Sequence, residues 1–287
     1  MKKLIILALI GLAAQLVDGS LGMGFGITST SLLLLLGSAP AAASASVHFA
    51  EVVTNAASGI SHIRFGNVNK QTVLRLIIPG SIGAFVGACF LSSLPGDVMK
   101  PYISGFLLCL GVYIICRFAC KSHTKPPSNK GFSKKQLIPL GLVAGFMDAT
   151  GGGGWGPVTT PMLLAKNEDE PRKVVGSVDT SEFAVSLSAT LGFLISLGWS
   201  EVNWTWVIAI MIGGIVAAPA AAWLVRKLPA HLLGVLVGGI IILTNLRILM
   251  HTGDFFSETF INISYATVVL IWAIAVWASI KRNRSNR

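Results

Sequence analysis

Two aspartates, Asp18 and Asp148, each precede a cluster of glycines in apolar surroundings. The first block, GLAAQLVDGSLGMGFG, ends at Gly26, and the second, GLVAGFMDATGGGGWG, ends at Gly156, so the motif returns after 130 positions (148 minus 18). Glycine lets another group approach the backbone closely. A helix that begins after such a cluster directs free N–H groups and its positive dipole end at an anion. The pattern therefore indicates an anion site made from two helix N-termini, beginning near Phe25 and Trp155.

The candidate site residues come from both blocks and from the hydroxyl residues that follow them. They are Gly22, Gly24, Phe25, Gly26, Thr28, Gly152, Gly154, Trp155, Gly156 and Thr159. The alternative is that the glycines only allow helices to pack tightly. Although Gly151-x-Gly153-x-x-Gly156 matches a dinucleotide-binding pattern, no strand precedes it, so that match is accidental.

Four acidic residues form two matched pairs. Asp18 and Asp148 are one pair, and Glu51 in VHFAE and Glu182 in VDTSE are the other. An acid inside a membrane is costly and marks a functional site by default. For the aspartates, helix capping is preferred to proton coupling; for the glutamates, carrying a coupling proton and anchoring the adjacent hairpin stay equally open.

His48 and Asp179 also occupy equivalent positions, 131 apart (179 minus 48). We expect each to be a lone polar residue whose hydrogen bonds are satisfied locally. The sequence indicates no catalytic residue, cofactor or metal site.

The elements that must position these residues are helices in a membrane. Mean hydropathy is +0.73, and 12% of residues are charged, against about 25% in soluble proteins. Apolar runs near the roughly 20 residues of a transmembrane helix predict spans at 46–63, 73–92, 101–120, 176–197, 204–225, 232–250 and 260–281. We therefore expect an all-α, multi-pass protein of the cell membrane.

The positive charge predicts the orientation in the bilayer. The net charge is +10, but the cations gather in the loop 117–136 and the tail 281–287, which is typical of cytoplasmic segments. This distribution excludes nucleic acid as a partner, and it places Asp254 and Glu258 outside.

Four spans separate the cytoplasmic tail from the end of segment 137–165, so this segment ends on the cytoplasmic side. It also begins there, after the basic loop. It is therefore expected to be a hairpin of short helices near 137–149 and 155–165, and segment 4–36 is its counterpart. Three spans after each hairpin give the two repeats opposite orientations. The rival interpretation makes 4–36 one tilted span.

The expected organisation has four parts. Residues 1–120 form repeat 1, 121–136 a basic cytoplasmic loop, 137–250 repeat 2, and 251–287 an external loop, a last helix and a basic tail.

The two Asp-glycine blocks, the Val-x-x-x-Glu segments after them and the apolar layout resemble the TauE/SafE family of anion permeases, often called sulfite exporters. The resemblance covers nearly the whole chain. It implies a secondary transporter for a small anion, most specifically sulfite or a C2 organosulfonate such as sulfoacetate, working by alternating access and in the direction of export.

The implied partners are the anion, protons or sodium as coupling ion, the lipid bilayer and a second copy in a homodimer. Two alternatives stay open. One is an anion channel of the same architecture, and the other is a membrane redox protein with His48 and His62 as haem ligands.

Overall fold

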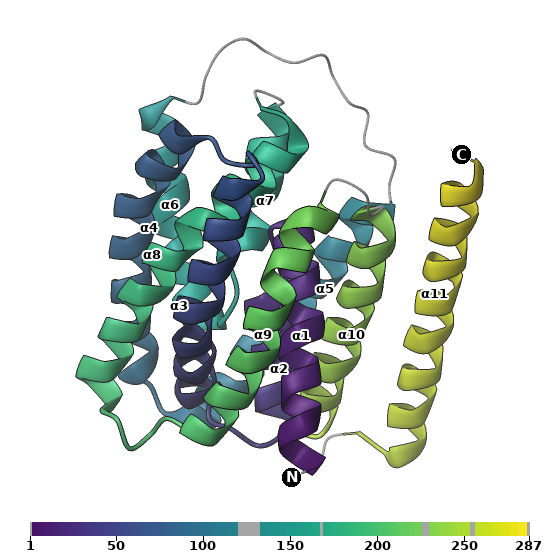
Figure 1. Cartoon of the computed structure of the whole chain (residues 1–287). Coiled ribbons are helices and arrows are strands. Elements are labelled where there is room, and N and C mark those ends of the chain that lie inside the picture. The colour runs from purple at the N-terminus through teal and green to yellow at the C-terminus, as the bar shows by residue number, and fades with distance from the viewer. Residues whose placement is uncertain (1, 120–132, 167–168, 226–229, 253–255, 286–287) are drawn as a thin grey trace.

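The computed structural model describes residues 2–119, 133–166, 169–225, 230–252 and 256–285. The described chain is all-helical and contains no strand (Figure 1). The helices are α1 (Lys2–Leu21), α2 (Phe25–Leu35), α3 (Pro40–Arg64), α4 (Lys70–Ser92), α5 (Gly96–Ala119), α6 (Lys134–Gly151), α7 (Trp155–Lys166), α8 (Pro171–Leu197), α9 (Trp204–Leu224), α10 (Ala230–Met250) and α11 (Glu258–Ser285). The predicted all-α, multi-pass architecture is confirmed.

Both predicted breaks lie at the glycine clusters. Gly22 and Gly24 separate α1 from α2 with φ of 69° and 135°, and Gly152 and Gly153 separate α6 from α7 with φ of 66° and 153°. Side chains of L-residues rarely adopt these angles, so glycine is needed where the chain reverses. The segment 4–36 is therefore a helix–turn–helix and not one tilted span.

The first hairpin differs from the expectation in the length of its first arm. α1 has 20 residues, and its Leu4–Leu21 portion is apolar and long enough to cross a bilayer. α2 has only 11 residues. The two arms are thus unequal, because the apolar run before the glycines begins almost at the start of the chain.

The two hairpins enter the bundle from opposite ends. α1 begins at the end that carries the N-terminus, whereas α6 begins at the end toward which the C-terminus points (Figure 1). Each first arm packs on a helix of the other half, α1 on α9 and α6 on α4, while α3 lies against α8 between them.

Glycines make these helix contacts close. A β-carbon at Gly11 in α1 would overlap the carbonyl of Ile210 in α9, and one at Gly145 in α6 would overlap the carbonyl of Gly80 in α4. Small residues at such positions let backbones approach, which is how helices associate in a membrane without a hydrophobic driving force. The hairpins are therefore held mainly by the opposite half of the chain.

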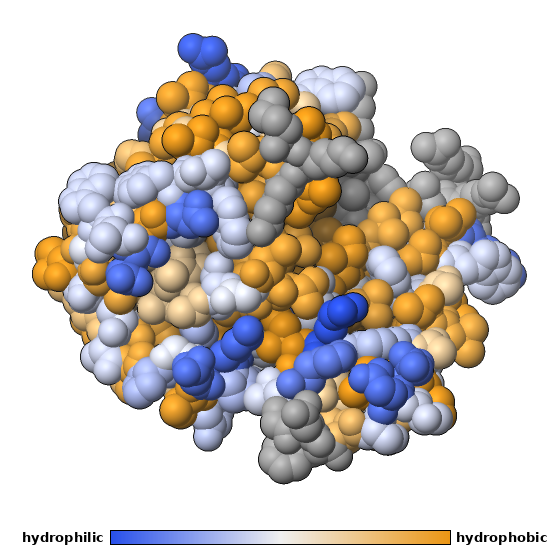
Figure 2. Space-filling model, turned by 90° about the horizontal axis from the view of Figure 1, so that it is seen from below, coloured by the Kyte–Doolittle hydropathy of each residue, from blue (hydrophilic) through white to orange (hydrophobic). Residues whose placement is uncertain are grey.

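The outer surface is apolar. Among the described residues, six helices are long and apolar enough to cross a membrane. Hydrophobic residues extend across the end of the molecule seen in Figure 2 and along its rim, with strongly hydrophilic residues in separate patches. α3 is absent from the six, although it has 25 residues, because it carries many buried polar side chains. These polar side chains of α3 lie in the centre of the bundle.

α11 stands beside the bundle and packs on α10 (Figure 1). Its Trp272 ring lies against Gly239, and the indole N–H donates to the carbonyl of Val235 at 2.9 Å. The rest of the helix is largely exposed, with Leu270 and Trp277 above 60%. Such a surface fits lipid.

Candidate functional site

The two hairpin tips meet in the centre of the bundle. Thr30 in α2 donates to the carbonyl of Gly152 at 2.8 Å, and Thr160 in α7 donates to the carbonyl of Gly22 at 2.7 Å. These two bonds are equivalent under the 130-residue offset of the repeats. The prediction that the tips lie together therefore agrees with the structure.

The glycines leave little space between the tips. A β-carbon on Gly26 would lie 2.7 Å from both the carbonyl oxygen of Gly152 and the Cα of Gly153. One on Gly154 would lie 2.7 Å from the backbone nitrogen of Asp148. Tight packing, which the sequence offered as the alternative role of these glycines, is thus a real requirement, whether or not the tips also bind an anion.

Both aspartates cap the helix that follows their glycine cluster. The Oδ1 atom of Asp148 accepts the backbone N–H of Gly154 at 2.8 Å and of Trp155 at 3.0 Å. The Oδ1 atom of Asp18 accepts the single N–H of Phe25 at 3.4 Å. The capping interpretation therefore describes Asp148 well and Asp18 only weakly.

Some N–H groups in the first turns remain available. Among the described residues, the backbone N–H groups of Gly26, Ile27 and Gly156 have no acceptor. The buried hydroxyls of Thr28 and Ser29 in α2 also have no partner. Backbone N–H groups and hydroxyls of this kind are the donors that an oxyanion needs.

Two of the predicted site residues are already occupied by other bonds. The indole N–H of Trp155 donates to the carbonyl of Val178 at 3.1 Å, and the hydroxyl of Thr159 donates to the carbonyl of Trp155 at 2.5 Å. The aromatic rings after both clusters pack on helices of the opposite half: Trp155 lies against Gly80 in α4, and Phe25 against Gly214 in α9. These residues shape the tips and offer no free donor from their side chains.

A first charged cluster lies where α6 meets α3. It contains His48, Glu51 and Asp148, whose possible ligand atoms lie within 4.8 Å of one another. His48 Nδ1 lies 2.8 Å from the carbonyl of Ser44, and Nε2 lies 3.2 Å from Asp148 Oδ2. A carbonyl only accepts, so Nδ1 donates; the second bond then joins Nε2–H to a carboxylate when the ring is a cation. In that state His48 balances the charge of Asp148.

A second cluster occupies the equivalent place where α1 meets α8. It contains Asp18, Asp179 and Glu182, again within 4.8 Å of one another and buried. Here the position of His48 is taken by Asp179. Asp18 Oδ2, both oxygens of Asp179 and Oε2 of Glu182 have no hydrogen-bond partner among the described residues.

The expectation for His48 and Asp179 needs correction. His48 has satisfied hydrogen bonds but is not a lone polar residue, and Asp179 is neither lone nor satisfied. The sequence indicated only that His48 and Asp179 occupy equivalent positions in the two repeats. Their contacts with the aspartates follow from the packing of α3 next to α6 and of α8 next to α1.

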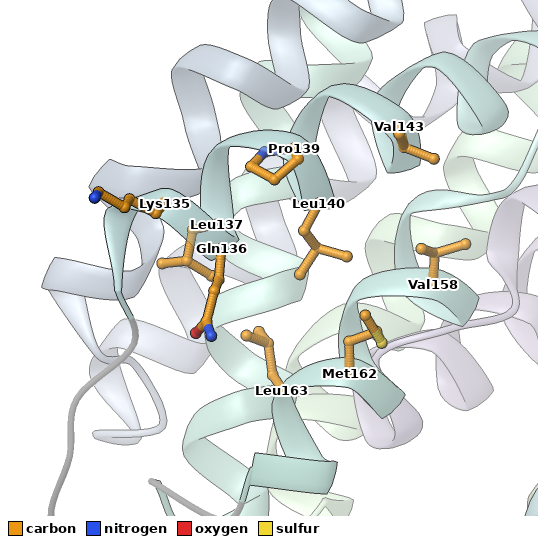
Figure 3. A pocket seen from close by; sticks show the side chains of 9 residues that line it. All are labelled: Lys135, Gln136, Leu137, Pro139, Leu140, Val143, Val158, Met162 and Leu163. Carbon is orange, nitrogen blue, oxygen red and sulfur yellow. The ribbon is translucent and has the colours of Figure 1, made fainter.

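The cavities outside the tips do not replace this site. One of about 500 Å³ opens between α6 and α7. Leucine, valine and methionine side chains of both helices face it, and Lys135 and Gln136 lie at one end (Figure 3). It includes none of the predicted site residues, and its apolar lining does not suit a small anion.

A second cavity, of about 230 Å³, carries positive charge. It lies at the end of α2, where Leu34 and Leu35 face Lys100, Arg247 and His251. The place of Arg247 beside Lys100 puts two cationic side chains at this end of the bundle.

Comparison with known proteins agrees with these features. The family described as "Sulfite exporter TauE/SafE" matches residues 7–248, which covers α1 to nearly the end of α10. The chain is 62% identical over 280 residues to "Probable membrane transporter protein YtnM" of Bacillus subtilis (strain 168), covering 96% of this chain and 92% of that protein.

A more distant relative from the same organism is "Probable membrane transporter protein YdhB". It is 24% identical over 179 residues, covering 61% of this chain and 71% of that protein. No solved structure matches the chain significantly. The sequence match over both halves shows that this chain belongs to the TauE/SafE family and is a multi-pass membrane transporter, not an enzyme.

Proposed function

We propose that the protein is a secondary transporter, working as an exporter, of a small oxyanion, with sulfite or a C2 organosulfonate such as sulfoacetate as the preferred substrate. The observation that carries this proposal is the meeting of two half-helix N-termini whose Gly26, Ile27 and Gly156 N–H groups lack acceptors in the described part of the chain. Sulfonate and sulfite oxygens accept hydrogen bonds from such groups. The unpartnered Thr28 hydroxyl adds a donor from the same turn.

The arrangement of the hairpins supports alternating access. Their entry from opposite ends of the bundle is what an inverted repeat produces, with the substrate site at the interface of the repeats. The tips are tightly packed in this structure. Substrate entry on either side therefore requires one hairpin, with the helices on which it packs, to move relative to the other.

The carboxyl groups near the tips support cation coupling. Asp18, Glu51, Asp148, Asp179 and Glu182 are all buried, and negative charge on them would repel an anion in a medium of low dielectric constant. A protonated His48 would balance one such charge. Protons or metal cations that neutralise the others, and that move together with or in exchange for the anion, would couple its transport.

The basic cavity at the end of α2 supports an anionic cargo. Lys100, Arg247 and His251 would raise the local concentration of anions at that end of the protein. An anion channel would use the same features without alternating access. Saturation of flux and its dependence on a cation gradient would distinguish a carrier from a channel.

The experiment that tests the proposal is a thermal-shift screen of the purified full-length protein in detergent. Sulfite, thiosulfate, sulfoacetate, taurine and small carboxylates are added at constant pH and ionic strength. We expect sulfite or sulfoacetate to raise the unfolding midpoint saturably, because a ligand that binds the folded state stabilises it. The proposal fails when none of the sulfur oxyanions shifts the midpoint more than chloride does.

A further inference from the structure

The two charged clusters share one construction and differ in one decisive position. In each, an aspartate of the first hairpin arm faces two residues of a central helix, Asp148 facing α3 and Asp18 facing α8. The central helix supplies His48 to the first cluster and Asp179 to the second. The first cluster thus contains a basic side chain, and the second contains three carboxyl groups and no basic member.

At three matched positions the second cluster has polar neighbours where the first has none. The 131-residue offset (182 minus 51) pairs His62 with Phe193 and Ser58 with Ala189, and the 130-residue offset (148 minus 18) pairs Gln15 with Gly145. Phe193 lies against the His48 ring, with ring centroids 5.8 Å apart. The second cluster has His62 in the corresponding place, with Nε2 3.8 Å from Asp179 Oδ2.

Several of these polar groups are buried and have no partner. The Ser58 hydroxyl faces the Asp179 carboxyl, and both Ser58 and Gln15 lie beside Gly19, the residue after Asp18. Ser58 and Gln15 are fully buried, and the Ser58 hydroxyl and both amide atoms of Gln15 have no hydrogen-bond partner in the described part of the chain. Buried polar atoms are normally satisfied. The buried Ser58 hydroxyl, which faces the Asp179 carboxyl, therefore points to a ligand beside the three carboxyl groups.

The donor atoms define the chemistry of that ligand. The carboxylates of Asp18, Asp179 and Glu182 and the Ser58 hydroxyl are all oxygen donors, which hard cations prefer. His62 Nδ1 is engaged with the Asn67 amide at 3.3 Å. Its Nε2 is farther from Asp179 than His48 Nε2 is from Asp148, 3.8 Å against 3.2 Å. The histidine therefore neutralises the second cluster less directly.

We propose that Asp18, Asp179 and Glu182 bind a hard metal cation, such as Na⁺, and that protonated His48 supplies the equivalent positive charge in the other cluster. The binding site is independent of the identity of the anion. The further step, that this cation travels with the anion, rests on the proposed function. The two equivalent clusters would then use a fixed cation and an exchangeable one.

The first test measures cation binding alone. Full-length protein is purified in detergent with choline as the main cation, and its unfolding midpoint is followed during titration with NaCl, CaCl₂ or MgCl₂ at constant ionic strength. We expect one cation to raise the midpoint saturably, by about 5–10 °C at a hundredfold excess over its Kd. The responding salt separates Na⁺ from the divalent cations. A protein that responds to none of the three overturns the proposal.

Two exchanges of side chains locate the site. Asp179→His gives the second cluster the composition of the first, so its cation response should be lost; Asp179→Asn, which keeps the shape, should weaken it at least tenfold. The reciprocal change, His48→Asp, should create a second set of three carboxyl groups and increase the bound cation, measured with ²²Na⁺ or ⁴⁵Ca²⁺. A parent-like cation response in both Asp179 variants would place the cation elsewhere and overturn the assignment.

A further variant separates the metal from a proton on His62. His62→Gln removes the nearby ring and leaves every proposed oxygen ligand in place, so its metal response should persist. If His62→Gln lost the metal response while Asp179→Asn responded like the parent, the proposal would be contradicted. Failure of the anion screen with an intact cation response would reject the proposed function and leave this site standing.

Discussion

At the scale of single residues, the glycines at the tips matter first because no larger side chain fits there. Gly26 illustrates this, because a methyl group there meets the backbone of Gly152 and Gly153 at 2.7 Å. Gly105 in α5 offers a matched comparison, because its β-carbon position has no atom within 4 Å. Both are helical glycines, and they differ in what surrounds them.

We predict that Gly26→Ala destabilises the protein by about 1–3 kcal/mol, the usual cost of overpacking. Gly105→Ala should be neutral or stabilise by up to about 1 kcal/mol, since alanine favours the helix. Unfolding in detergent measures both. Equal free energies of unfolding for the two variants would contradict the prediction, because the tips would then accommodate the methyl group without loss of stability.

The two capping aspartates should respond oppositely to loss of charge. Asp148 is bonded to two N–H groups and to His48, so Asp148→Asn leaves the buried histidine without its ionic partner and should cost about 3–5 kcal/mol. Asp18 faces two other carboxyl groups. Asp18→Asn removes their repulsion and should be neutral or stabilising.

The measurement is chemical unfolding in buffer without added metal cations. The control is Asp97→Asn at the start of α5, in an exposed turn outside both clusters. A larger loss for Asp18→Asn than for Asp148→Asn would contradict the described difference between the clusters.

At the scale of elements, sequence periodicity and composition predicted much of the fold. Apolar runs located α4, α5 and α8 to α11, and glycines located both hairpin turns. The spans were predicted a few residues too short at their N-terminal ends, where Pro40 and Pro171 begin α3 and α8 with weakly apolar turns. Such turns carry a helix signal from proline at N1 but little hydropathy.

The composition of the charged clusters could not be predicted in the same way. His48 and Asp148 are 100 positions apart, and Asp18 and Asp179 are farther apart still. Local patterns carry no information about such contacts. The repeat offset gave the equivalence of His48 and Asp179, but only the packing of each hairpin arm on a central helix shows that they contact the aspartates.

The orientation of these elements in the bilayer is a separate prediction. With Cys89, Cys109, Cys116 and Cys120 replaced, Ser128→Cys in the basic loop should resist an impermeant thiol reagent added to intact cells. Position 128 lies outside the described residues. Ser200→Cys, in the exposed turn between α8 and α9, should be labelled. The reverse pattern would invert the scheme, and labelling of both positions would reject it.

At the scale of the whole molecule, the two clusters combine six ionisable groups from α1, α3, α6 and α8, five of them acidic, and His62 lies next to Asp179. On the proposed function, cations that share a site of this charge would balance the anion. The two clusters, each with members from both repeats, offer two separate places for such cations. We therefore expect each glutamate to report on its own cluster.

We predict that Glu51→Gln and Glu182→Gln affect transport differently. Glu51 faces His48 on α3, Asp148 on α6, Asp18 on α1 and the Ser186 hydroxyl on α8, so it is placed to carry a proton. Glu51→Gln mimics its protonated form at nearly constant shape. It should preserve anion binding and flatten the pH dependence of uptake into proteoliposomes.

Glu182 lies beside Asp18 on α1 and Asp179 on its own helix, and it interacts electrostatically with Glu51 on α3 and Asp148 on α6. Because its cluster lacks a counterpart of His48, Glu182→Gln should chiefly weaken the dependence of uptake on the metal cation and change the pH profile less. Radiolabelled uptake measured across pH, with Na⁺ or choline outside, resolves the two effects. If both variants keep the parent's pH profile and cation dependence, neither glutamate couples transport, and Asp18 becomes the group to test, since its Oδ2 atom is buried without a partner beside Asp179.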